Sequence, residues 1–393
     1  MRILMISDVY FPRINGVSTS IFTFRSEMQK LGHDVYLIAP LYPEPFTDDE
    51  HIIRIDSRSV VLDPEDRIMK YRDIISQIES LGKLRFDLLH IHTPFVAHYA
   101  GVKIGKALSV PVICTYHTLF EEYLYHYIPS LPKSFLRLCA RKFSVSQCNQ
   151  VAGVISPSSL IVDLLKRYGV KTRIITLPTG IDAKHFERGD GARFRAKLSI
   201  PVDKKLLLNV SRIAFEKNIG DILSMFDSVQ NVMPNTMLVI AGEGPAKQSC
   251  IQQAKDMQLE EKIVFVGYLD RNSELIDCYK AADLFVFSST TETQGLVLLE
   301  SMAAGTPLVS VAAMGTKDVL KENIGVRITS GDIDDFAEKV IDVLRNNADR
   351  EKLAQSGLVY AREWDSKRLA QKMLDFYVGV GDVWEQHGTP QTD

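Results

Sequence analysis

Short apolar runs alternate with longer amphipathic segments along the whole chain of 393 residues. Because apolar residues spaced every three to four positions are typical of helices, we predict helices over 19–31, 66–80 and 158–168. Strands that are apolar throughout and separated by helices are typical of a parallel sheet covered on both faces. In the first half, the runs that predict strands are 2–7, 34–39, 87–92, 111–117, 151–156 and 173–178.

The same pattern starts again in the second half of the chain. The segment PTGIDAKHFERGDG (178–191) lies between the two sets and is rich in Gly, Pro and charge, which is typical of a domain boundary. We therefore predict an α/β chain with a first Rossmann-like domain over 1–183, a second over 184–365, and a segment 366–393. That segment holds a helix over 366–378 and packs back on the first domain. The second set of strands is 205–211, 236–242, 262–267, 283–288 and 307–312.

Composition narrows the class of protein. Hydrophobic residues make up 46% and charged residues 24%, which is typical of a globular protein, and the net charge of −3 argues against a nucleic-acid partner. The five cysteines form no C-x-x-C pair, which favours reduced thiols in the cytoplasm. The N-terminal apolar run is too short for a signal peptide, and no run approaches the ~20 residues of a membrane span. We expect a cytoplasmic protein whose contact with a membrane is peripheral, on its inner face.

Two glutamates stand eight positions apart in TETQGLVLLESMAAGTPLVS. Glu292 lies in the loop before a predicted helix over 295–304, and Glu300 lies on that helix. The unpaired N–H groups at a helix start attract phosphate, and Gly295 lets a ligand approach the backbone. The spacing alone leaves an alternative, in which Glu292 serves the helix dipole and Glu300 is a solvated surface residue.

Further candidate ligand groups follow other strands. Arg212 and Lys217 come after the strand 205–211 and suit a diphosphate, although surface cations at this spacing are also ordinary. Gly16, after Asn15, lets a phosphate approach the first predicted helix. The fingerprint G-x-G-x-x-G is absent there, which argues against a nicotinamide dehydrogenase.

These motifs, taken in order, resemble those of the retaining GT-B glycosyltransferases of family 4: the glycine loop, GHDV, PTGID, R-x4-K, GEGP, and E-x7-E followed by MAAGTP. The resemblance implies two Rossmann-like domains that face each other across a cleft, a nucleotide-sugar donor, and no metal or other cofactor. It also implies that Glu292 contacts the donor sugar, that Glu300 binds the ribose, and that Arg212, Lys217 and Gly16 hold the diphosphate.

The remaining donor residues come from the loops of the second domain. Gly242 in AGEGP and Tyr268 in VGYLD end two strands and are expected to flank the nucleobase. The family often has Gly-Phe after the first glutamate, whereas Thr293 and Gln294 stand here. We expect both to line the donor site and to alter sugar selection, while Gly295 keeps its position.

Three histidines and one acidic pair are further candidates. His117 ends the strand 111–117, and the resemblance implies that it reaches the donor sugar. His90 and His92 share one face of a strand, and without a third ligand in the sequence we expect a structural or cleft-lining role. Asp332-Ile333-Asp334 spells the metal motif D-x-D, but it precedes a helical pattern and is interpreted as a helix cap.

The segment 115–143 supplies the candidates for the acceptor side. It is rich in aromatic residues such as Tyr123, and Lys133, Arg137 and Arg141 recur every four residues. This is typical of a basic amphipathic helix on an anionic membrane, and also of an ordinary surface helix. The string TYHT-x-FEEYLYHY resembles diacylglycerol glucosyltransferases, which implies UDP-glucose as the donor and a lipid as the acceptor.

The predicted function is transfer of a hexose from a nucleotide-sugar to a hydroxyl group, with retention at the anomeric carbon. Glu292, His117, Arg212 and Lys217 are the residues expected to act on the reacting groups. The alternatives are a polysaccharide or soluble sugar acceptor, an epimerase of UDP-sugars on the same fold, and a non-catalytic sugar-nucleotide binding protein.

Overall fold

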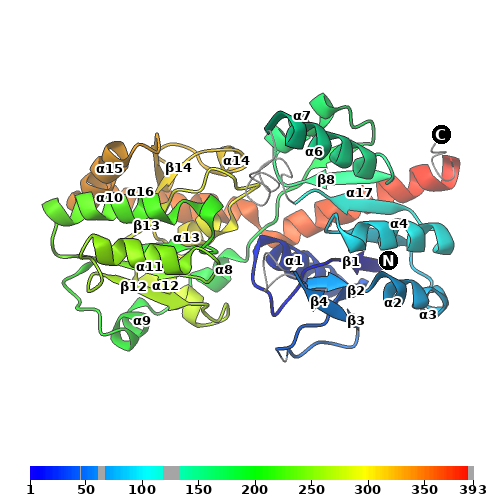
Figure 1. Ribbon diagram of the computed structural model, residues 1–393, viewed down its shortest axis with the longest axis horizontal. Helices are drawn as coiled ribbons and strands as arrows, with labels where there is room; N and C mark the ends of the chain where they lie inside the picture. Colours follow the sequence, from blue (N-terminus) through cyan, green and yellow to red (C-terminus); the bar gives the residue numbers. More distant parts are fainter. Residues whose placement is uncertain (45, 61–66, 118–132, 388–393) are drawn as a thin grey trace. The chain divides into compact units, whose positions relative to one another are not determined.

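The computed structural model describes residues 1–44, 46–60, 67–117 and 133–387 (Figure 1). The chain forms two compact units. Unit 1 comprises Met1–Gly180 and Ser366–Asp393, and unit 2 comprises Ile181–Asp365. The C-terminal segment thus belongs to unit 1, and the first boundary comes three residues before the expected one.

Unit 1 is built on a parallel sheet of seven strands in the order β3-β2-β1-β6-β7-β8-β9. The inner strand β1 is apolar from Ile3 onward, and Ile3, Leu4 and Met5 are fully buried because helices cover both faces of the sheet. All six strands predicted here are present, and β3, β4 and β5 were missed. The strands are β1 (Arg2–Ile6), β2 (Asp34–Pro40), β3 (Ile52–Ile55), β4 (Ser57–Ser59), β5 (Arg67–Met69), β6 (Leu88–Ile91), β7 (Val112–Thr115), β8 (Gly153–Ser156) and β9 (Ile174–Thr176).

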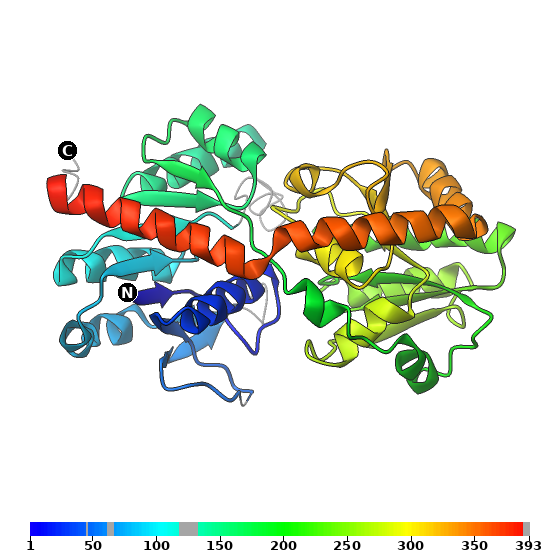
Figure 2. The ribbon, with the colours of Figure 1, turned by 180° about the vertical axis from the view of Figure 1, so that it is seen from behind.

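Helices α1 and α17 lie side by side on one face of this sheet, the blue and red helices of Figure 2, and α4 packs on the other. Helix α1 begins at Gly16, three residues before the predicted start, because the Asn15 side chain accepts a hydrogen bond from the amide of Ser18. The helices of unit 1 are α1 (Gly16–Lys30), α2 (Tyr71–Ser76), α3 (Ile78–Leu84), α4 (Val96–Leu108), α6 (Lys133–Cys148), α7 (Ser159–Tyr168) and α17 (Ser366–His387).

The helix predicted over 66–80 is confirmed only in part, because its first residues form a strand and the rest is divided between two short helices. Strand β5 pairs antiparallel with β4, and two short helices, α2 and α3, follow. Pairing with a strand ten residues earlier overrides the local helical pattern here, since Ser57 lies opposite Met69 and the Lys70 amide bonds the Asp56 carbonyl. Helix α17 also continues nine residues beyond the predicted end at residue 378.

Unit 2 has a parallel sheet of six strands in the order β12-β11-β10-β13-β14-β15. All five predicted strands are present, and the short edge strand β15 was missed. The strands are β10 (Lys205–Val210), β11 (Thr236–Ala241), β12 (Ile263–Gly267), β13 (Leu284–Phe287), β14 (Leu308–Val311) and β15 (Val326–Thr329).

Helices again cover both faces of the unit 2 sheet. One core contains α10, α11 and α15, and the other contains α8, α9, α12, α13 and α16. The prediction of two doubly wound α/β units is therefore confirmed. The helices are α8 (Ala183–Phe186), α9 (Gly191–Lys197), η1 (Phe215–Lys217), α10 (Ile219–Val232), α11 (Lys247–Asp256), α12 (Glu274–Ala281), α13 (Leu296–Ala303), α14 (Thr316–Val319), α15 (Ile333–Arg345), α16 (Asn347–Ala361) and η2 (Arg362–Trp364).

Candidate functional site

The predicted donor residues of unit 2 follow the carboxyl ends of four strands. Arg212 comes after β10, Gly242 after β11, Tyr268 after β12 and Glu292 after β13. These strands are parallel and adjacent, in the order β12-β11-β10-β13, so their carboxyl ends share one edge of the sheet. Ligands of doubly wound sheets bind at this edge.

Lys217 and Glu292 form an ion pair at that edge. The distance from Lys217 Nζ to Glu292 Oε1 is 2.5 Å, and each side chain is 18% exposed. Ser288, at the end of β13, donates its hydroxyl to the carbonyls of Lys217 and Asn218, at 3.0 and 2.9 Å. The 3₁₀ turn that carries the lysine is thereby fixed to the strand that leads to the glutamate. Sequence reasoning missed Ser288 and Asn218, which bring together the cation and the carboxylate.

Glu300 is a buried residue with two partners. Its Oε1 accepts from an Nη of Arg271 at 2.6 Å, and its Oε2 accepts from the Tyr279 hydroxyl at 2.9 Å. Burial lowers the pKa of Arg271, but the charge of Glu300 and its hydrogen bond together act in the opposite direction, and the net shift is upward. Burial, followed by the Glu300 charge, raises the pKa of Tyr279 well above its usual value. The interpretation of Glu300 as a solvated surface residue is wrong, and both partners were missed.

Gly295 stands directly before α13 with a φ of +84°, a region that favours glycine. No side chain caps this helix start, so its N–H groups are not bonded by a capping residue. The preceding loop is held close to Gly315, where a Cβ would come within 1.9 Å of the Thr293 carbonyl oxygen. Gln294 is buried and Thr293 half-buried, so the two residues that differ from the family pattern belong to a packed loop.

Gly242, which has a predicted ligand role, and Gly244 beside it both have a packing role. Their φ values are +139° and +153°, and a Cβ on Gly242 would lie 1.9 Å from the carbonyl oxygen of Ser211. The loop after β11 thus crosses directly over the loop after β10, which carries Arg212. Arg212 itself is half-buried, and Tyr268 in the next loop is exposed.

In unit 1, Gly16 is the first residue of α1. A Cβ placed there would meet nothing within 4 Å, so the backbone of the first helical turn borders open space. The residue is suited to close approach of a ligand, as its predicted role requires.

Three histidines cluster at the ends of β6 and β7, where His90 and His92 are buried and His117 is half-buried. His92 Nδ1 lies 3.2 Å from His117 Nε2, and His90 is bonded to Tyr377 and Thr115 at 2.6 and 2.7 Å. Burial lowers the pKa of His117 to about 4 and lowers the pKa of His90 and His92 well below the usual value. The cluster is therefore neutral at pH 7. The sequence does not link His117 to His92, because helix α4 and strand β7 lie between them in the chain.

Within 1–44, 46–60, 67–117 and 133–387, no group of three or more His, Cys, Asp or Glu side chains is arranged to hold a metal ion. The Asp332 side chain accepts hydrogen bonds from the amides of Asp334 and Asp335 at the start of α15. The interpretation of the D-x-D string as a helix cap is confirmed.

Asp8, directly after β1, is a further buried carboxyl that the sequence did not single out. It accepts a hydrogen bond from the Thr93 hydroxyl at 2.8 Å and from the Ala97 amide, at the start of α4, at 3.1 Å. Burial raises the pKa of Asp8 to about 6, although these hydrogen bonds act in the opposite direction. Its position supports a structural role as a cap for α4.

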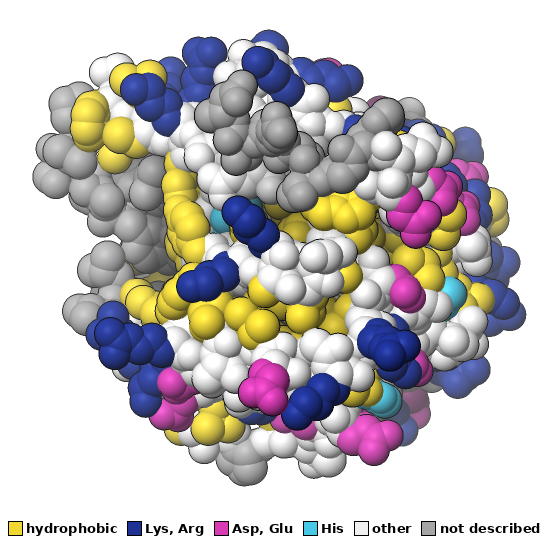
Figure 3. All heavy atoms as spheres, turned by 90° about the vertical axis from the view of Figure 1, so that its right-hand side faces the viewer, with side chains coloured by type: hydrophobic (Ala, Val, Ile, Leu, Met, Phe, Trp, Pro, Cys, Tyr) yellow, Lys and Arg dark blue, Asp and Glu magenta, His cyan; other side chains and the backbone are white. Residues whose placement is uncertain are grey.

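Helix α6 carries the predicted basic stripe. Arg137 and Arg141 are exposed, and Phe135 and Leu138 beside them are half exposed, whereas Leu136 faces the core. Lys133 is the first residue of this helix, and Tyr123 lies outside the described residues. Figure 3 shows one face of the molecule, on which hydrophobic side chains lie beside Lys and Arg side chains. Among the described residues, no helix has both the length and the apolar character needed to cross a membrane.

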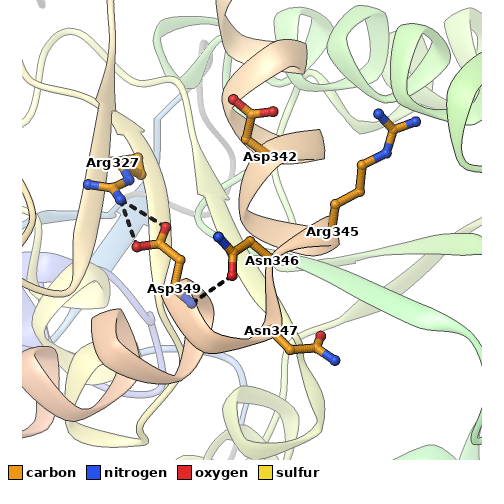
Figure 4. Close-up of a pocket in the computed structure, with 6 residues that line it drawn as sticks. All are labelled: Arg327, Asp342, Arg345, Asn346, Asn347 and Asp349. Carbon is orange, nitrogen blue, oxygen red and sulfur yellow. Dashed lines mark hydrogen bonds and ion pairs between the residues drawn. The ribbon is translucent and has the colours of Figure 1, made fainter.

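A polar pocket of about 630 Å³ opens elsewhere in unit 2. It lies between α15, α16 and the first half of β15, where Arg327 pairs with Asp349 at 2.8 Å (Figure 4). This is the edge of the sheet opposite to the strand carboxyl ends, and none of the predicted donor residues lines it. The pocket is therefore not the candidate donor site. Its lining consists of Arg327, Asp342, Arg345, Asn346, Asn347 and Asp349.

Comparisons with known proteins agree with this geometry. Residues 14–185 match Glycosyltransferase Family 4, and residues 190–359 match Glycosyl transferases group 1. The chain is 32% identical to the alpha-monoglucosyldiacylglycerol synthase of Streptococcus pneumoniae, over 96% of this chain and 86% of the relative. It is 26% identical to a GDP-mannose-dependent alpha-mannosyltransferase of Corynebacterium glutamicum, over 98% and 86% of the two chains.

A solved structure confirms the fold class. HepE of Anabaena, in complex with UDP and glucose, matches with a TM-score of 0.78 over 96% of this chain and 100% of that chain. The identity is 14%, so the similarity is one of fold, and the predicted GT-B fold class is confirmed.

Proposed function

The chain belongs to the group 1, family 4 glycosyltransferases, and from this premise we propose that it transfers a hexose from a UDP-sugar to a membrane lipid with retention of configuration. The enzyme class is established by the family, and the donor is a nucleotide-sugar. The identity of the sugar, the base, the acceptor and the stereochemical course are the proposal.

The observation that carries the proposal is the ion pair between Lys217 and Glu292, next to the uncapped start of α13. A diphosphate leaving group develops negative charge as its bond to the sugar breaks, and a preorganised cation and helix N-terminus stabilise that charge. Lys217 and Arg212 supply the cations and Gly295 supplies access to the helix start. Glu292 is adjacent to the cation and is free to exchange its ion pair for hydroxyls of the sugar.

The proposed chemistry needs no covalent intermediate. The acceptor oxygen bonds to the anomeric carbon on the same face from which the diphosphate leaves, and the carbon–oxygen bond to the diphosphate breaks. The acceptor proton passes to an oxygen of the departing diphosphate. From unit 1, the neutral imidazole of His117 holds a hydroxyl of the sugar, so that the donor is oriented without a second charge.

The choice of a UDP-sugar and a lipid rests on the relatives. The S. pneumoniae relative is named for synthesis of monoglucosyldiacylglycerol, and HepE was solved with UDP and glucose. The C. glutamicum relative uses GDP-mannose, so a GDP-sugar is the competing donor. The exposed surface of α6 supports a lipid acceptor, because an apolar and basic surface suits an anionic membrane. This surface consists of Phe135, Leu138, Arg137 and Arg141.

The test measures release of nucleoside diphosphate from UDP-glucose, UDP-galactose and GDP-mannose, with and without vesicles of diacylglycerol and anionic phospholipid. We expect release from a UDP-hexose that depends on diacylglycerol, with an α-linked glycolipid as the product by NMR. Release of nucleoside diphosphate at the same rate with and without lipid would indicate a soluble sugar or a polysaccharide as the acceptor. Interconversion of UDP-sugars without transfer would replace the transferase with an epimerase.

A further inference from the structure

The carboxylate of Glu300 is held from both sides by two side chains of unit 2. Arg271 contacts one oxygen and Tyr279 the other, at 2.6 and 2.9 Å. A carboxylate has about four lone-pair positions, so two hydrogen bonds leave one acceptor position on each oxygen. A ribose presents two neighbouring hydroxyls, which match two acceptor positions fixed side by side.

The two partners are themselves fixed. Tyr279 is fully buried, and its ring packs against Phe186 and Phe285 with centroids 6.0 and 5.8 Å away. Its backbone carbonyl accepts a hydrogen bond from the Thr306 hydroxyl at 2.7 Å. The phenol therefore donates from a rigid position, and its raised pKa keeps it protonated.

Exposure distinguishes the two sides of the carboxylate. The Glu300 side chain is 2% exposed, whereas that of Arg271 is 27% exposed. The open approach to Glu300 is therefore on the side of Arg271, in the loop after β12. A ligand that reaches the carboxylate arrives there, while Tyr279 fixes the carboxylate from behind.

We propose that Tyr279 and Arg271 are positioning residues that hold Glu300 so that it selects nucleotides with intact ribose hydroxyls. The proposal rests on the proposed function, since it takes a nucleoside diphosphate as the ligand of this site. Fixed acceptors bind a diol without first paying a reorganisation cost, and a carboxylate that rotates freely loses that advantage.

The experiment is calorimetric titration of the protein with UDP and with 2′,3′-dideoxy-UDP. The wild-type protein is expected to bind UDP at least about tenfold more tightly, since a hydrogen bond to a charged group contributes about 1.5–3 kcal/mol. Tyr279→Phe keeps the ring and removes the hydroxyl. It is expected to weaken UDP binding about tenfold and to leave dideoxy-UDP binding unchanged. The ratio of the dissociation constant for dideoxy-UDP to that for UDP therefore falls toward one.

Arg271→Ala is expected to reduce the same ratio, and Arg271→Lys, which keeps the charge, to restore part of it. Matched controls come from the same unit. Tyr360→Phe alters another buried tyrosine, and Arg327→Ala removes an arginine of similar exposure, 29%, that pairs with Asp349 at the opposite edge. Both controls should leave the ratio unchanged.

Three results would overturn the inference: an unchanged ratio in Tyr279→Phe, an equal fall in Tyr360→Phe, or tighter UDP binding by Arg271→Ala. The last result would make Arg271 a competitor of the ribose. Failure of the proposed function is distinguishable, because the wild-type protein would then bind neither UDP nor its dideoxy analogue.

Discussion

The strand ends of the two units are built from opposite kinds of polar group. In unit 2, buried or half-buried carboxylates contact cations: Glu292 contacts Lys217, and Glu300 contacts Arg271. In unit 1, the corresponding strand ends carry the histidine cluster, in which burial keeps His90, His92 and His117 neutral.

This difference in polar groups indicates which part of a substrate each unit is suited to bind. A diphosphate carries charge that must be neutralised once it leaves water, and a site with preformed cations does this at low reorganisation cost. A hydroxyl of a sugar or lipid is uncharged and needs only a neutral donor or acceptor. We therefore expect the cations of unit 2 to neutralise the diphosphate, and the histidines of unit 1 to offer neutral contacts to hydroxyl groups.

The largest effect is expected from Lys217→Ala, which breaks the charged site. The change removes the cation proposed for the diphosphate and leaves Glu292 half-buried without its partner. We expect the rate of UDP release to fall about 10²–10³-fold, the loss typical of removing one group that stabilises developing charge. The measurement is the initial rate of UDP release at saturating donor.

Lys70→Ala is the matched control for this prediction. Lys70 pairs with Asp56 at 2.6 Å in unit 1, but both side chains are more than half exposed, at 57% and 59%. Because exposed ion pairs contribute little to stability, the rate of UDP release by Lys70→Ala should stay within about twofold of the wild type. Equal losses in both variants would mean that the Lys217 pair acts only through the fold.

The next largest effect is expected from mild acid, which should destabilise unit 1 more than unit 2. The histidines of unit 1 have folded pKa values below the unfolded value of about 6.5. Their neutral forms stabilise unit 1 fully above that pH, and this stability is lost as the pH falls toward the folded pKa, about 4 for His117. Between pH 6 and 5, each histidine should lower the free energy of unfolding of unit 1 by about 1 kcal/mol or slightly more.

Hydrogen exchange followed by mass spectrometry measures the loss of protection in β6 and β7 of unit 1 and compares it with that in β10 and β13 of unit 2. The exchange rates are corrected for their intrinsic dependence on pH. His98 on α4, whose pKa burial also lowers to about 4, adds to the loss in unit 1. Unit 2 is the internal control. Its Asp335, whose pKa is held below the usual range by Lys339, loses its stabilising charge only below about pH 4. Equal protection losses in both units in this window would contradict the comparison.

The smallest effect is expected at the surface of unit 1. Arg137→Ala on α6 should weaken binding to vesicles with anionic lipid about fivefold, since one basic residue near such a surface contributes about 1 kcal/mol. Sedimentation with vesicles at two salt concentrations measures it. Arg167→Ala, an exposed arginine on α7, is the control. If both variants bind alike, α6 is an ordinary surface helix.

Local sequence was a good guide to the strands and a poorer guide to short or edge elements. The apolar runs that became β1 and β10 are buried on both faces, so burial alone specifies them. Strand β5 and helix α2 lie within a segment of helical periodicity, and pairing with β4 decided the outcome. For the site, spacing and family resemblance selected Glu292 and Glu300, while their partners stayed unknown.

The sequence by itself determined the two α/β units, the families that match them, and the placing of candidate residues directly after strands. Those properties depend on hydrophobic periodicity and on motifs whose residues are near one another in the chain. Only the tertiary structure decided what each candidate contacts. Lys217 meets Glu292 across 75 positions, Arg271 meets Glu300 across 29, and His117 meets His92 across 25. Parallel strands bring distant segments to one edge of a sheet, so partners at that edge have no fixed spacing in sequence.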